Sequence, residues 1–225
     1  MKPEFHANEP TENALGFIRK PTLGLRAMVS DQRGALSAPD FEAMTGEIRS
    51  LFEKYSRALE KAAPGSERAR VLHGMMETAM ASASEIQVTC RRGCCGCCHS
   101  EVEVTQDEAI LLREMVDGGF GIDRERLGLQ ASRERLSPEW QRFWSPENRC
   151  VFLNAAGECG IYRERPAACR KLVVTTPADW CTTPGSAVSP VRILLAEIVI
   201  SAALSMDGVV SASISKMLGP LLASS

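Results

Sequence analysis

The chain has 225 residues, of which 44% are hydrophobic and 24% are charged. These values are ordinary for a soluble globular protein of one domain or two small ones, and a net charge of -2 gives no general attraction to nucleic acid or anionic lipid. Aromatic residues make up only 5%, and the apolar content is mainly Ala, Leu, Val, Ile and Met, which suits packed helices better than a β-sandwich. We therefore expect a mainly α protein, a helical bundle with a loop-rich insert and at most short β pieces.

The first 37 residues contain several Pro and Gly residues and no sustained apolar period, which predicts an irregular N-terminal arm over 1–37. The acidic and polar start lacks the basic and apolar regions of a secretory signal, so we expect a cytoplasmic protein. Residues 38–225 should form a single helical domain that contains a cysteine-rich region over 88–181.

Two apolar patterns with helical spacing follow the arm. The first runs from Phe41 to Leu59, with Asp40 as its expected N-cap, and ends at Pro64-Gly65. The second begins at Ser66 and extends to Ile86. Together they predict an antiparallel helical hairpin. The second pattern is rich in Met, which could be a soft-metal or partner surface, but a Met stripe at this spacing is typical of a core.

The sequence after residue 100 predicts further helices. Thr105 and Glu108 form a capping box for a helix that ends at Gly118-Gly119. The arginine-rich stretch 123–144 should be helical in two pieces, and because its Arg residues alternate with Glu we interpret it as a solvated face rather than an RNA-binding surface.

The last third of the chain divides into a loop-rich part and an apolar tail. Residues 145–187 should be loops, with strand-like pieces at 150–153 and 160–162. The tail, 191–222, predicts two apolar helices split near Asp207-Gly208. Its longest apolar stretch is interrupted by charged residues and is too short to span a membrane.

All nine cysteines lie between Cys90 and Cys181, and five of them fall in the ten-residue run from Cys90 to His99. Structural disulfides are rare in a reducing compartment, and an odd number of thiols does not suit a fully paired framework. Thiols at this density indicate metal binding or redox chemistry. The fold prediction therefore becomes a helical bundle with a metal-binding insert.

The spacing within the run limits the geometry of a metal site. Cys94 with Cys97, and Cys95 with Cys98, are interleaved pairs three residues apart, and such pairs can aim two sulfur atoms at one point where direct neighbours cannot. This predicts two centres, or one polynuclear centre held from two sides. Thiolates favour zinc, Cu(I) or iron–sulfur clusters. Arg91 and Arg92 are expected to lower the pKa of the thiols nearby or to contact substrate.

Four more cysteines follow at intervals of about ten residues. They are Cys150, Cys159, Cys169 and Cys181. The total exceeds what one mononuclear site can use and suits two four-cysteine sites with one thiol left over.

The order of these elements resembles a known family. Its pattern is seen in Cys90-x3-Cys94-x2-Cys97-Cys98, in Cys150-x2-Leu153, and in Cys159-x-Ile161-Tyr162-x2-Arg165-Pro166-x2-Cys169-Arg170. Over about residues 88–172 the chain is similar to the YkgJ-type cysteine-cluster family, the CxxCxxCC zinc- or iron-chelating domain. The resemblance implies a bacterial metal-binding domain with relatives that include a flagellin lysine methylase.

The resemblance also implies a set of ligands, namely Cys90, Cys94, Cys97, Cys98, Cys150, Cys159 and Cys169. Cys181 lies beyond the end of the pattern, and we count it as an eighth candidate ligand. Cys95 is extra to the pattern, and His99 is a nitrogen donor among many thiols. Whether Cys95, Cys181 and His99 coordinate metal is left open at this stage.

Three further residues, Tyr162, Arg165 and Arg170, are candidate cofactor-binding residues. In one interpretation Arg165 or Arg170 donates hydrogen bonds to ligand sulfur atoms and Tyr162 packs over the centre. In the other, the two arginines form an anion or carboxylate clamp beside a reactive centre. The first interpretation is favoured.

Three functions from different classes are compatible with these residues. We favour a protein that binds iron, as an iron–sulfur cluster of the [4Fe–4S] type, with a redox or protein- or peptide-modifying role as an oxidoreductase or modifying enzyme. The alternatives are a structural Zn²⁺ module that binds a protein partner, and a thiol redox sensor or metal chaperone. The sequence indicates neither a substrate nor a catalytic residue.

Overall fold

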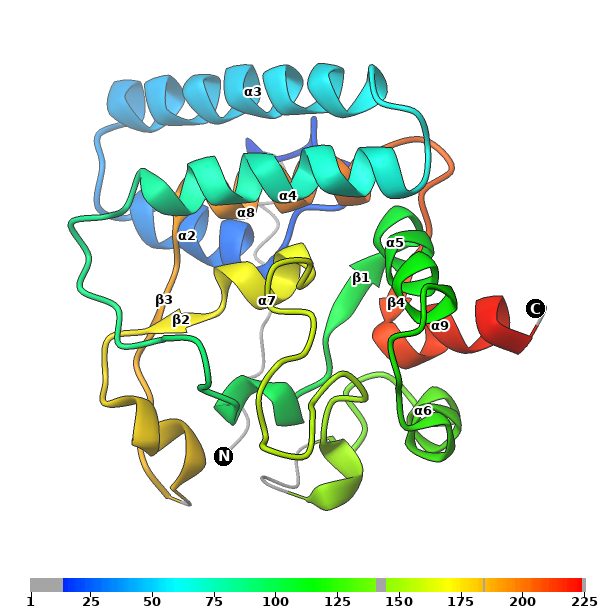
Figure 1. The fold of residues 1–225 in the computed structure, drawn as a ribbon. Coiled ribbons are helices and arrows are strands. Elements are labelled where there is room, and N and C mark those ends of the chain that lie inside the picture. The colour runs from blue at the N-terminus through cyan, green and yellow to red at the C-terminus, as the bar shows by residue number, and fades with distance from the viewer. Residues whose placement is uncertain (1–13, 141–144, 184, 224–225) are drawn as a thin grey trace.

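Two helical layers lie above the cysteine-rich segment in the computed structural model, which describes residues 14–140, 145–183 and 185–223 (Figure 1). The helices are α2 (Leu23–Arg33), α3 (Ala38–Glu60), α4 (Ser66–Ala81), α5 (Gln106–Asp117), α6 (Arg124–Ala131), α7 (Ala167–Lys171), α8 (Leu194–Ser205) and α9 (Ile214–Ala223). Three single 3-10 turns are η1 (Gly96–His99), η2 (Pro146–Asn148) and η3 (Ala178–Thr182). The expectation of a mainly α fold is confirmed.

The strands are short and form two separate antiparallel pairs. They are β1 (Glu103–Thr105), β2 (Val173–Val174), β3 (Pro190–Val191) and β4 (Ser211–Ser213). β1 pairs with β4 in the register Val104 to Ala212, and β2 pairs with β3. Of the strand-like pieces expected at 150–153 and 160–162, only a single bridge between Leu153 and Cys159 is present.

Helix α8 is the centre of the main core. Ala196, Ile198, Val199 and Ala202 have no exposed surface, because α2, α3 and α4 pack on this helix from different sides. A second cluster joins α5, β1 and α9 to Phe152 and other buried residues of the loop-rich part. The cysteine-rich segment is therefore anchored to the helical body through apolar contacts.

The predicted hairpin is present, with corrections at its ends. The N-cap of α3 is Ser37, whose Oγ accepts from the backbone N–H of Asp40 at 3.4 Å, so Asp40 lies in the first turn and is not the cap. Helix α4 follows Gly65, whose φ of +100° favours glycine. It ends at Ala81, five residues before the end of the apolar pattern at Ile86.

The expectation of an irregular arm over residues 1–37 is wrong for Leu23–Arg33, which form α2. Thr22 caps this helix by accepting from the N–H of Leu25, and Leu25 and Val29 are buried against α8. Two apolar residues at an i, i+4 spacing are too few to stand out among Pro and Gly, and tertiary packing supplies the rest of the stability. Residues 1–13 of the expected arm lie outside the described residues.

The arginine-rich stretch 123–144 was expected to be helical in two pieces, and only the first is present, as α6 capped by Asp123. The expectation of a second piece is wrong for residues 132–140, which form turns, and 141–144 lie outside the described residues. The tail forms α8 and α9, separated by β4. No helix in the described ranges has the length and apolar character needed to cross a membrane.

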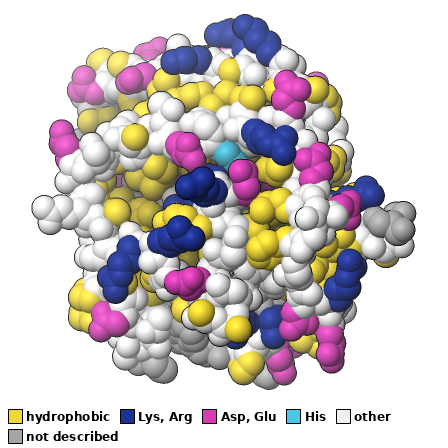
Figure 2. All heavy atoms as spheres, in the orientation of Figure 1, with side chains coloured by type: hydrophobic (Ala, Val, Ile, Leu, Met, Phe, Trp, Pro, Cys, Tyr) yellow, Lys and Arg dark blue, Asp and Glu magenta, His cyan; other side chains and the backbone are white. Residues whose placement is uncertain are grey.

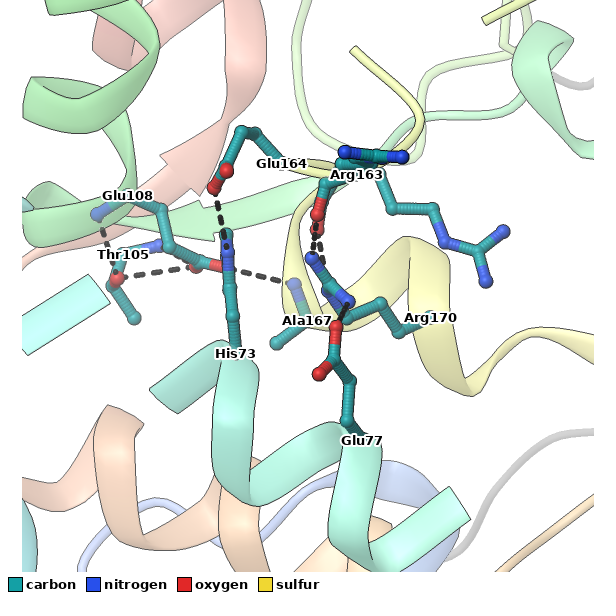
Figure 3. A network of polar contacts seen from close by, with 9 residues as sticks. His73, Glu77, Thr105, Glu108, Arg163, Glu164, Ala167 and Arg170 are labelled. Carbon is teal, nitrogen blue, oxygen red and sulfur yellow. Dashed lines mark hydrogen bonds and ion pairs between the residues drawn. The ribbon is translucent and has the colours of Figure 1, made fainter. Parts of the chain in front are cut away.

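One buried carboxylate connects the helical body to α7. The capping box is confirmed, because Thr105 Oγ1 accepts from the N–H of Glu108 and Glu108 Oε2 accepts from the N–H of Thr105 at 2.9 Å. The other oxygen of Glu108 accepts from the N–H of Ala167, the first residue of α7, at 2.7 Å and lies 3.3 Å from His73 Nε2 on α4 (Figure 3). Glu108 is 3% exposed, so this group links three helices inside the protein.

Burial by itself raises the pKa of Glu108. The hydrogen bonds from His73 and from the backbone N–H groups of Ala167 and Thr105 outweigh that effect and hold the pKa of Glu108 below its ordinary value. Glu108 is therefore charged in the folded protein near neutral pH, and the folded state favours that charge.

The substitution Glu108→Gln should lower the free energy of unfolding by about 2–4 kcal/mol at pH 7, because it removes the charge from a buried hydrogen-bonded group. Because the folded-state pKa is depressed, this contribution is present above the unfolded pKa of about 4.3 and is lost as the pH falls through the folded value. The difference between wild type and variant should therefore shrink in acid.

Urea unfolding at pH 7 and about pH 3 measures both effects. The matched control is Glu114→Gln, which removes an exposed carboxylate that pairs with Arg70 and should cost less than about 1 kcal/mol. Equal losses in the two variants, or a Glu108→Gln deficit that does not depend on pH, would contradict the role given to Glu108.

Candidate metal centre

Hydrogen bonds and close packing bring the distant cysteine segments together. The backbone N–H of Cys150 donates to the carbonyl of Cys98 at 2.7 Å, which joins the loop that carries Cys150 to η1. The N–H of Val174 in β2 donates to Cys90 Sγ at 3.4 Å, which joins the end of the α7 segment to the start of the run. All nine cysteines are free thiols and partly buried.

Gly96 allows η3 to approach η1. A Cβ at position 96 would lie 2.4 Å from Cys181 Cβ, far inside van der Waals contact. Only a residue without a side chain permits this approach, and it places Cys181 beside the first cysteine run although 83 residues separate it from Cys98. The structure thus brings the eighth candidate ligand to the same region as the other seven.

Two adjoining cavities reach the thiols. The α4 cavity, about 400 Å³, lies beside the end of α4 and is lined by Met80, Cys90, Cys94 and Leu172 among others. The β1 cavity, about 250 Å³, lies beside β1 and is lined by Cys98, Cys150 and Cys159 among others. Both are lined by Cys94, Cys97, Cys169, Tyr162 and Arg165.

Cys97 lies between two sets of thiols. Burial is the main cause of the raised pKa of most thiols, and the negative charge of Cys97 adds to the shift of seven of them, namely Cys90, Cys95, Cys98, Cys150, Cys159, Cys169 and Cys181. Besides Cys97, the charge of Cys94 raises the pKa of Cys90, Cys95 and Cys181, and the charge of Cys90 also raises that of Cys181. Those that repel Cys98 and Cys169 are Cys150 and Cys159.

The first set is therefore Cys90, Cys94, Cys95 and Cys181, and the second set is Cys98, Cys150, Cys159 and Cys169. Each set has four thiols, and Cys97 is close to both. The sequence predicted enough cysteines for two four-cysteine sites with one thiol left over. It could not indicate which thiols group together, because the grouping depends on the fold.

Cys97 is the thiol most ready to ionise. The hydrogen bond from Cys98 lowers the pKa of Cys97 to about 7 against the effect of burial, with the charge of Arg165 as a smaller contribution. Its partner Cys98 shifts in the opposite direction, because that hydrogen bond and burial both raise its pKa. Burial likewise raises the pKa of Cys150 to about 11. A thiolate at Cys97 is thus surrounded by thiols that resist ionisation.

The three candidate cofactor-binding residues have different roles in the structure. Arg170 is held by its surroundings, because its guanidinium donates to Glu77 at 2.8 Å and to the carbonyls of Arg165 and Arg163 (Figure 3). Arg165 lies over the Tyr162 ring, 4.3 Å from its centroid, and its buried Nε has no hydrogen-bond partner. Of these three residues, Arg165 and Tyr162 line both cavities, whereas Arg170 lines the α4 cavity alone.

Arg165 is the cation whose charge lowers the pKa of Cys90, Cys97 and Cys159, although burial outweighs it at Cys90 and Cys159. Arg91 and Arg92, which were expected to have this effect from their sequence position, are both exposed. The sequence named Arg165 as a candidate, but its contact with the thiols depends on the turn at 161–166 that folds back under η1.

His99 is not part of either cavity. Its Nδ1 lies 3.3 Å from the carbonyl of Cys95, and burial lowers its pKa. Among the described residues, no group of three or more His, Cys, Asp or Glu side chains is already close enough to hold one metal ion. Seven of the nine thiols line the two cavities rather than surrounding a single point, and Cys95 and Cys181 line neither cavity.

Helix α7 fixes three consecutive side chains to three parts of the protein. Cys169 lines both cavities, Arg170 pairs with Glu77 of α4, and Lys171 Nζ pairs with the buried Glu197 of α8 at 2.8 Å. Pro166 is the N-cap of this short helix.

The residues present fit a thiophilic metal. Nine thiols repel one another once ionised, and Arg165 is a nearby cation with an unused buried N–H. A bound cation or cluster would offset the thiolate charge, and soft thiolate donors select zinc, Cu(I) or iron–sulfur centres. The eight predicted ligands are the residues that would hold it.

Comparison with known proteins agrees with this reading. Residues 89–183 match the model of the CxxCxxCC family, described as "Putative zinc- or iron-chelating domain". A search of curated proteins and a search of solved structures each gave no significant match. The match covers all nine cysteines, since the first, Cys90, and the last, Cys181, both fall within its limits. Residues 89–183 are therefore similar to the zinc- or iron-chelating cysteine-cluster domain of the CxxCxxCC family, which supports metal binding by this part of the chain.

Proposed function

We propose that the cysteine cluster binds iron, as an iron–sulfur centre of the [4Fe–4S] type, and uses it in a redox or protein- or peptide-modifying reaction. The observation that carries this proposal is the arrangement of two four-thiol sets around Cys97 beside an open cavity. A cluster of several iron and sulfide ions fills a wider space than one metal ion, which suits thiols gathered around cavities rather than around one point. A reducing, cytoplasmic compartment suits nine free thiols.

Accessibility favours a reactive centre over a structural one. Structural zinc sites are closed by four protein ligands, whereas reactive centres keep an open side. The α4 cavity has a volume of about 400 Å³ and is lined by Cys90, Cys94, Cys97 and Cys169. A ligand in that cavity would lie next to the thiols.

Structural zinc is the second candidate, favoured by the way the cysteines lie on separate short elements, η1, η3 and α7, which one metal could connect. Metal binding would then stabilise this segment by roughly ten kcal/mol or more. A thiol redox sensor or metal chaperone is the third candidate, favoured by the lowered pKa of Cys97.

The nature of the metal should be visible in protein purified without oxygen. An iron–sulfur centre predicts a brown protein with broad absorption near roughly 400 nm and iron with acid-labile sulfide. Metal analysis and a visible spectrum measure this. A colourless protein with about two zinc ions would support structural sites instead, and a correctly folded protein that takes up neither metal would reject both.

Single substitutions should separate two centres from one. Cys97 is close to both sets, so Cys97→Ser should remove nearly all of the metal, while Cys150→Ser, in the second set only, should remove about half if each set holds its own centre. A single polynuclear centre predicts nearly complete loss in both variants. Metal content per folded chain is the readout, and full retention in Cys97→Ser would rule out the assignment.

The contact between η1 and η3 provides a test for Cys181 that leaves every thiol in place. Gly96→Ala should push η3 away, because the added Cβ meets Cys181 Cβ. If Cys181 is a ligand, the variant should lose metal as Cys181→Ser does. Gly121→Ala, at a loop glycine with no neighbour near the added Cβ and no positive φ, controls for a general effect of replacing a loop glycine. Unchanged metal content in both Gly96→Ala and Cys181→Ser would exclude Cys181.

A further inference from the structure

The α4 cavity opens onto an apolar surface. Figure 2 shows apolar side chains gathered in a hollow between α4 and β2. Ile86, Val88 and Leu172 line this cavity and are 37%, 41% and 41% exposed, although they are large apolar residues. Exposed apolar residues are common singly, but a cluster that continues into a cavity indicates a surface that another group covers.

The charges of the cavity are unbalanced. Its charged lining residues are Arg91, Arg165 and Arg170 against one acid, Glu77. Glu77 is already paired with Arg170 at 2.8 Å. The Arg165 guanidinium has no hydrogen bond or ion pair with any residue that the structure describes, and its contact is the face of the Tyr162 ring. A cation in a partly buried position therefore has donors available at the inner end of an apolar hollow.

These two features define the chemistry of a ligand. The apolar wall favours an aliphatic or aromatic body, and a guanidinium with free donors favours a carboxylate, which it can bind through two parallel hydrogen bonds. A volume of about 400 Å³ is within the range of small-molecule sites. The ring of Tyr162 keeps Arg165 in place, so little side-chain freedom would be lost on binding.

We propose that the α4 cavity binds a carboxylate with an apolar body, with its charged end on Arg165 and its apolar part against Ile86, Val88 and Leu172. The source is a free organic acid or the C-terminal carboxylate of an apolar peptide, which share this chemistry. The ligand would lie beside Cys90, Cys94 and Cys97. As a substrate class this rests on the proposed function, but binding itself can be measured separately.

The test is calorimetric titration of the metal-loaded protein with octanoate, and with octylamine of the same length and opposite charge. Octanoate should bind at least about tenfold more tightly than octylamine, and Arg165→Gln should weaken octanoate binding by about tenfold or more. Arg92→Gln, an exposed neighbour of the run that does not line the cavity, should leave binding unchanged. Equal binding of the two probes, or unchanged binding in Arg165→Gln, would overturn the proposal.

A second variant keeps the proposal testable if Arg165→Gln fails to fold. Ile86→Ser, on the apolar wall of the cavity, should weaken octanoate binding, whereas Leu129→Ser, also exposed but on α6 and outside the cavity, should not. An apolar tripeptide with a free C-terminus that binds better than octanoate, and loses binding on amidation, would identify the peptide as the source. Metal content, measured on every sample, reports separately on the proposed centre.

Discussion

Gathering many thiols into one partly buried region has an electrostatic cost that shapes the rest of this structure. Burial raises the pKa of most of these thiols, and the charge of neighbouring thiolates adds to the effect, so most of the nine resist ionisation. Cys97 is the exception, because Cys98 donates a hydrogen bond to it. A cation shared among these sulfur atoms would relieve the repulsion, which is why metal binding and the folding of this segment are expected to be coupled.

The helical body holds the segment through polar groups that are themselves buried. Glu108 completes the cap of its own helix and also receives the first N–H of α7, while His73 closes the other side. A charge in this position is stable only because every lone pair facing the interior has a donor. The position of Cys169 therefore depends on a carboxylate two helices away, and not only on its own loop.

Much of this architecture follows from local rules, and the remainder from contacts between distant segments. Periodic apolar residues predict the helices α3 and α5, and the residue types at Thr105 and Glu108 predict the capping box. Helix α2 was missed because its stability comes from packing against α8. The second role of Glu108 could not be predicted either, since Ala167 lies 59 residues further along the chain.

The candidate ligands show the same division. The cysteine pattern indicated the family, and the family match over 89–183 agrees with that resemblance, while the individual ligands stay a prediction. The division of the thiols into two sets, the place of Cys97 between them, and the contact of Arg165 with both cavities depend on turns whose course the spacing does not determine. The close approach of Gly96 to Cys181 had a signal in the sequence, an isolated glycine within a cysteine run, but nothing there named its partner.

Helix α7 has a consequence for how the centre could communicate with the rest of the protein. Because Cys169, Arg170 and Lys171 are successive residues of one short helix, any displacement of its backbone would move the thiol together with the two ion pairs that join α7 to α4 and α8. The cysteine cluster and the helical body are thus mechanically connected at this helix.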